Sequence, residues 1–150
     1  MNKQKLQEEL RRSMLAKDEL KTSVLRMILS AINYYEIQKG GAGYVANEED
    51  VLAVIQNQAK QRKDSIEQFT QAGRQELADK EQKELELLNV YLPEQISEEE
   101  ITKLVKESIL QTGAASLQDI GKVMGALMPK IKGKADGNLV NNIVKKELSS

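Results

Sequence analysis

The stretch GKVMGALMPKIKGKADG, residues 121–137, decides the fold of the C-terminal third of the chain. Its apolar residues recur at helical spacing up to Pro129, which we expect to limit that helix. A short basic turn follows, in which Gly133 permits an unusual backbone angle. Asp136 then suits the N-cap of a new helix. The segment therefore predicts two helices joined by a lysine-bearing turn of defined shape.

Helical periodicity continues toward the N-terminus, where we expect four helices. Stop signals divide them: glycines at residues 40–43, Gly73, and Pro93, which disfavours helical geometry in the residue before it. The predicted apolar positions are Leu6, Leu10, Met14 and Leu15 in the first helix, Val24, Leu25, Ile28, Leu29 and Ile32 in the second, Leu52, Ile55, Ala59, Ile66 and Phe69 in the third, and Leu77, Leu85, Leu88 and Leu92 in the fourth.

Three further helices are expected after Pro93, the first two beginning at the capping patterns Ser97/Glu100 and Ser116/Asp119. Their predicted apolar positions are Ile101, Leu104, Val105 and Ile109, then Ile120, Val123, Met124 and Leu127, then Leu139, Val140, Ile143 and Val144. No alternating segment indicates a strand. The sequence therefore predicts an all-α protein with two helical bundles, a four-helix bundle over residues 1–94 and a three-helix bundle over residues 95–150.

Composition excludes several function classes. The 150 residues include no cysteine and no histidine, so disulfides, thiol chemistry and the commonest general base and zinc ligand are absent. We expect no catalytic residue, no metal and no cofactor. Aromatic residues make up only 3% of the chain, which disfavours base stacking. Since there is no long apolar run and no signal-peptide pattern, we expect no membrane partner and a cytoplasmic location.

Charge is unevenly distributed along the chain. Residues 76–100 hold nine acids and two lysines, whereas residues 121–150 hold six lysines and two acids. The acidic segment is interpreted as a solvated helix face rather than a metal or acid–base cluster. The basic run at residues 59–65 is likewise interpreted as a solvated face rather than a phosphate site. Arg62 is the exception, because it interrupts an apolar row and is expected to be partly buried with a carboxylate partner.

Two catalytic motifs are absent: there is no Ser-x-x-Lys, and a P-loop is excluded because Met128 stands where its first glycine belongs. What remains is the run at residues 130–137. Lysines beside a helix N-terminus can form a phosphate cradle, although Asp136 competes for the same backbone donors. The pattern alone leaves anion binding and an ordinary helix connector equally open.

The chain resembles the GatB/YqeY family, and a stand-alone YqeY-like protein in particular. The resemblance rests on five segments in this order: LRM at 25–27, KQRKDS at 60–65, YLP at 91–93, GKVMG at 121–125 and GKADG at 133–137. It implies two all-α bundles, the second similar to the tail domain of the B subunit of tRNA-dependent amidotransferase. That tail domain helps to hold the tRNA, whereas the chemistry belongs to other parts of the enzyme.

The resemblance implies a non-catalytic accessory protein that binds tRNA or another structured RNA, and no DNA. The RNA-facing residues that it implies are Lys122, Lys130, Lys132 and Lys134, while Gly121, Gly125 and Gly133 are assigned structural roles. Two alternatives stay open: a component of glutamine-dependent amidation (carbon–nitrogen ligase activity), and an interaction module with a protein partner.

Overall fold

The computed structural model describes residues 1–149, and within this range the chain is all-α, as predicted, with no strand. It divides into two compact units, Met1–Leu92 and the part from Pro93 onward. The first unit holds α1 (Lys3–Leu15), α2 (Glu19–Gly40), the short 3-10 helix η1 (Gly41–Gly43), α3 (Glu48–Gln71) and α4 (Gln75–Val90). The second holds α5 (Glu98–Thr112), the 3-10 helix η2 (Leu117–Asp119), α6 (Ile120–Ile131) and α7 (Gly137–Leu148).

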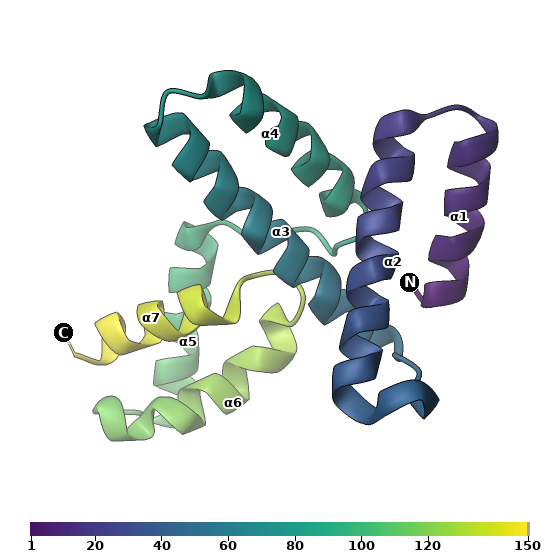
Figure 1. The fold of residues 1–150 in the computed structure, drawn as a ribbon. Coiled ribbons are helices and arrows are strands. Elements are labelled where there is room, and N and C mark those ends of the chain that lie inside the picture. Colours follow the sequence, from purple (N-terminus) through teal and green to yellow (C-terminus); the bar gives the residue numbers. More distant parts are fainter. Residues whose placement is uncertain (150) are drawn as a thin grey trace. The chain divides into compact units, whose positions relative to one another are not determined.

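The first unit is built from two helical pairs, α1 with α2 and α3 with α4, and α2 also contacts α3 and α4 (Figure 1). Its core centres on the predicted stripe of α2, of which Leu25, Ile28 and Ile32 are fully buried. Asn47 caps α3 as expected, and Asp50 completes a capping box with it. Helical periodicity and capping therefore account for most of this unit.

The C-terminal end of α1 departs from the prediction. Met14 is 50% exposed and Leu15 is 85% exposed, although both were expected on the apolar face. Ser13 takes the buried position instead, because its hydroxyl donates to the Leu10 carbonyl at 2.8 Å and lies 2.9 Å from the Thr22 hydroxyl. A satisfied polar pair thus replaces an apolar contact where the chain turns into α2.

Two further leucines expected on apolar faces, Leu77 and Leu139, are 40% and 37% exposed. In α4 the buried position of the first turn belongs to Ala78, the adjacent residue on the helix. Periodicity predicts which side of a helix is apolar, but the neighbouring helix decides which residue at the margin of that side is covered.

The glycine-containing loop before α3 is tied down by tyrosines. The hydroxyls of Tyr44 and Tyr35 donate to the two oxygens of Asp50, at 2.6 and 2.8 Å. The Tyr44 bond, followed by the Tyr35 bond, lowers the pKa of the Asp50 carboxyl. The same hydrogen bond to Asp50 raises the pKa of Tyr44 to about 12.

The second unit packs α5, α6 and α7 against one another. Contrary to expectation, α6 does not end at Pro129 but continues to Ile131. Proline removes the bond that its own N–H would make to the carbonyl of Gly125, and Gly125 is exposed to water. Ile131 is 1% exposed, so its burial favours the extra half-turn despite the proline.

Candidate functional site

The predicted basic turn, within residues 130–137, has a defined backbone. α6 ends at Ile131, and the amide of Lys134 donates back to the Ile131 carbonyl at 2.8 Å. Gly133 is buried and takes φ +79°, a left-handed conformation that glycine adopts without strain. Asp136 then caps α7 by accepting from the amide of Asn138 at 3.1 Å. One of the donors at this helix end is therefore occupied by the chain itself.

The segment before α5 holds this turn in place. The Gln95 side chain donates to the carbonyls of Pro93 and Gly133, each at 2.8 Å. The amide of Ile96 donates to the Lys134 carbonyl at 3.1 Å. These bonds act on the backbone, so they constrain the points from which the exposed lysine side chains extend. No sequence signal identified Gln95 as the residue that makes this link.

The structure brings together three of the four predicted lysines. Lys130, Lys132 and Lys134 are exposed and lie within five residues at the end of α6. The Lys130 ammonium is 3.5 Å from the Gln111 side-chain oxygen. Lys122 lies eight residues earlier on α6, or about 12 Å along the axis, and its ammonium is 3.9 Å from Asp119. Lys122 is therefore not part of the cluster at the basic turn.

Gly121 and Gly125 do not serve a close helix approach in this unit. Both are exposed, and a Cβ added to either would meet no other heavy atom within 4 Å. Of the three glycines assigned structural roles, only Gly133 sits where its backbone conformation requires glycine.

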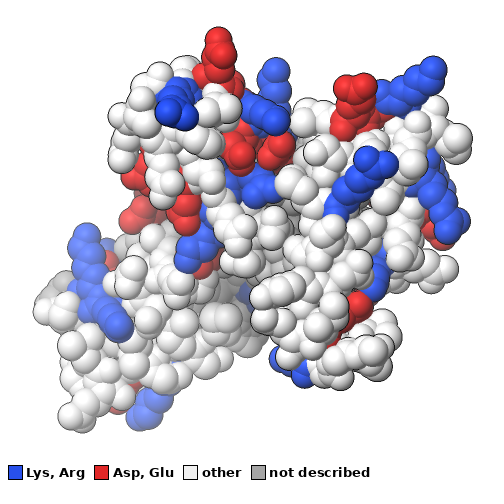
Figure 2. All heavy atoms as spheres, in the orientation of Figure 1, with Lys and Arg blue, Asp and Glu red and all other residues white. Residues whose placement is uncertain are grey.

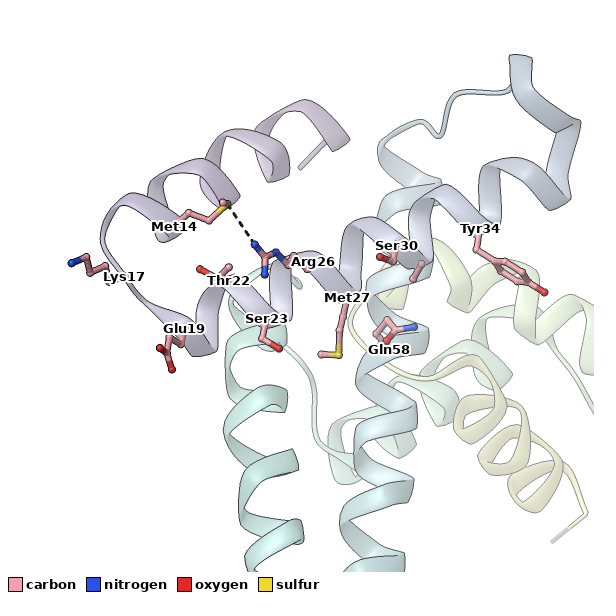
Figure 3. A pocket seen from close by; sticks show the side chains of 11 residues that line it. Met14, Lys17, Glu19, Thr22, Ser23, Arg26, Met27, Ser30, Tyr34 and Gln58 are labelled. Atoms are coloured by element: carbon pink, nitrogen blue, oxygen red, sulfur yellow. Dashed lines mark hydrogen bonds between the residues drawn. The ribbon is translucent and has the colours of Figure 1, made fainter.

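A second feature, which the sequence did not predict, is an open groove of about 940 Å³ in the first unit. It is lined by α2, by the α1 end and the following turn, and by Gln58 of α3 (Figure 3). Met14 and Met27 give it apolar lining, and Arg26 reaches toward Met14 with its guanidinium 4.0 Å from the sulfur. The missed signal is a second apolar spacing on α2: Met27, Ala31 and Tyr34 lie at i, i+4 and i+7, beside the core stripe.

Beneath Met27 lies the partly buried ion cluster of Arg62. The guanidinium donates to the Met27 sulfur at 2.8 Å, and its Nε is 3.4 Å from Glu81 and 3.2 Å from Glu84. The expectation of a partly buried arginine with a carboxylate partner is thereby confirmed. The interpretation of residues 76–100 as a solvated acidic face is wrong for Glu81 and Glu84, because Arg62 draws both carboxylates against α3. Elsewhere over α3 and α4, acidic and basic side chains are interspersed (Figure 2).

Over residues 1–149, no helix is both long and apolar enough to cross a membrane. Within the same range, no group of three or more acidic, cysteine or histidine side chains is arranged to hold a metal ion.

A family model described as Yqey-like protein matches residues 3–148. A protein of Pyrenophora tritici-repentis named "Altered inheritance of mitochondria protein 41, mitochondrial" is 34% identical over 87% of this chain and 71% of its own length. Proteins of the same name from Saccharomyces cerevisiae and Vanderwaltozyma polyspora are 34% and 30% identical. These matches cover 81% and 77% of this chain, and 68% and 64% of those proteins.

The names of these relatives contradict the expected cytoplasmic location, since each carries the word mitochondrial. The expectation rests on the lack of a membrane-spanning or signal-like segment. The aqueous interior of an organelle makes the same physical demands on a folded surface as the cytoplasm does. Surface composition therefore does not distinguish the two.

Proposed function

Because this chain belongs to the Yqey-like protein family, which is related to the C-terminal domain of the amidotransferase B subunit, we propose that it is a helical accessory protein that binds tRNA or another structured RNA. The observation that carries the proposal is the basic turn. Three exposed lysines project from a backbone segment held by Gln95 and Ile96.

The chemistry of the turn suits phosphate more than bases. Lysine ammonium groups neutralise phosphates and release counterions, which gives affinity without sequence readout. The only aromatic side chains of the chain are four tyrosines and one phenylalanine, all before residue 92, so the second unit has no platform for base stacking. RNA would therefore be recognised by shape and backbone contacts.

The test measures the affinity of bulk tRNA over a series of salt concentrations for the full chain and for K130A/K132A/K134A. Each lost phosphate contact lowers the log–log salt slope by about 0.7 to 0.9, so three contacts predict a decrease of about 2 to 2.7. The matched control is K103A/K106A/K145A, which removes three exposed lysines of the same unit. The log–log salt slope of this control should change by less than the amount expected for one phosphate contact, about 0.7.

K122A, tested alone, reports whether the RNA extends along α6 to its other end. A DNA duplex of similar length is the specificity control and should bind more weakly than tRNA. Equal slopes for the two triple variants would place the RNA elsewhere than on the basic turn. Absence of tRNA binding at low salt would overturn the proposal altogether.

A further inference from the structure

The groove of the first unit follows α2 from Glu19 to Tyr34. Fifteen residues of helix correspond to about 22 Å, or about four turns. Ser23, Ser30 and Ala31 contribute small side chains to its lining, so a partner's side chains can enter between the larger ones. The dimensions match one side of a helix lying along α2.

The lining suits a protein partner with apolar side chains. Met14 is 50% exposed and Tyr34 is 64% exposed, and Met27 lies between them along the groove (Figure 3). Methionines adapt to irregular apolar surfaces. An exposed tyrosine offers apolar contact area together with a hydroxyl for the rim. A bare phosphate backbone would leave these thioether and ring surfaces uncovered.

The charges at the rim are mostly positive. Within residues 1–149, Arg26 has no carboxylate partner, and its guanidinium lies 4.0 Å from the sulfur of Met14. Lys17 takes φ +56°, the only positive φ among the described residues that are not glycine. Its position directly after the C-cap of α1 is one where glycine is favoured. Lys17 therefore places a cation at the rim from a strained backbone position. Among the residues that line the groove, the one acid is Glu19.

We propose that this groove binds an amphipathic helix of another protein. Apolar side chains of that helix cover Met27, Ala31 and Tyr34, and acidic side chains along its flank pair with Lys17 and Arg26. This is the helix-in-groove mode of recognition, in which apolar anchors provide contact area and rim charges select the partner. The proposal is independent of RNA binding, since no residue of the basic turn contributes to it.

The experiment uses the full chain and two fluorescent synthetic peptides of 18 residues. Both are amphipathic helices with a leucine and alanine face; one has glutamate along the flank and the other has lysine. Fluorescence anisotropy should show saturable binding of the glutamate peptide and about tenfold weaker binding of the lysine peptide. A31R, which places bulk and charge in the groove, should abolish binding. R26E should lower the affinity for the glutamate peptide about tenfold and raise the affinity for the lysine peptide.

K17G separates recognition from folding. It removes the strained backbone and the cation together, so the variant should melt no lower than the parent while binding the glutamate peptide more weakly. L110R changes an 83% exposed leucine of α5 and is the control expected to leave binding unchanged. The variant K130A/K132A/K134A should also bind the peptide normally, whether or not the RNA proposal holds.

Any of these results would overturn the inference: neither peptide binds, the two peptides bind equally, binding is insensitive to A31R, or tRNA displaces the glutamate peptide. The groove could instead be occupied by a second copy of this chain, and analytical ultracentrifugation measures whether the chain forms a dimer. A dimer that A31R dissociates would assign the groove to a second copy of this chain and would also overturn the proposal.

Discussion

Replacing Arg62 with methionine tests the ion cluster between α3 and α4. The side chains of Arg62, Glu81 and Glu84 are only 12%, 22% and 9% exposed. R62M keeps most of the apolar stem but leaves two carboxylates against α3 without a cation. Removing one partner of a buried ion pair costs about 3 to 5 kcal/mol because the remaining charge is poorly solvated.

For R62M we expect a decrease in the free energy of unfolding slightly below the cost of about 3 to 5 kcal/mol for breaking a buried ion pair. The cluster retains some solvent contact, and Arg62 Nε makes no well-aligned hydrogen bond to either carboxylate. We therefore expect R62M to lower the free energy of unfolding by about 2 to 4 kcal/mol. For a cooperative unit of this size that corresponds to a decrease in Tm of about 10 to 20 °C.

Urea unfolding followed by circular dichroism measures the decrease in the free energy of unfolding of R62M. Two further variants show whether the ion cluster is its cause. K63M alters the next residue, an exposed lysine of the same helix, and should change stability by about 0.5 kcal/mol or less. R62M/E81L/E84L replaces the whole cluster with apolar side chains and should recover most of the loss. A loss below about 1 kcal/mol in R62M, or a triple variant no more stable than R62M, would refute the reasoning.

Two further predictions concern single polar groups. Ser108 is fully buried, and its hydroxyl has no hydrogen-bond partner among residues 1–149, so S108A should raise the free energy of unfolding by about 1 kcal/mol. S13A removes the hydroxyl that donates to the Leu10 carbonyl and should lower the free energy of unfolding by about 1 kcal/mol. Chemical denaturation of both variants checks the opposite signs. The pKa of Asp50 is lowered from 3.8 in the folded state, so its stabilisation is present above that pH and is lost as the pH falls through the folded pKa. Thermal melts from neutral pH downward should show the gap in Tm between the parent and D50N shrinking below pH 3.8, and a gap that is constant or grows would contradict this account.

Several features followed from local sequence because their causes are local. The apolar stripe on α2 predicted the core residues Leu25, Ile28 and Ile32, since helical spacing alone places them on one side. Asn47 predicted the start of α3, because a cap satisfies the backbone of its own first turn. Arg62 was predicted to be partly buried because a charge in an apolar row must lie at a packed face.

Other features depended on which segments meet. The exposure of Met14 and the burial of Ser13 follow from a contact with Thr22 across the turn between α1 and α2. Glu81 and Glu84 look like ordinary surface acids until α4 lies beside Arg62. The basic turn similarly acquires its fixed shape from Gln95, which is 38 residues away from Gly133 in the chain.

By itself the sequence determined the helical class, most helix boundaries and the gathering of positive charge in the last third of the chain. These depend on periodicity, capping and composition, which act over a few residues. Only the tertiary structure decided that α6 continues through Pro129 and that α2 lines an open groove. Burial and cavities arise from surfaces of distant segments meeting, and a local pattern does not specify which surfaces meet.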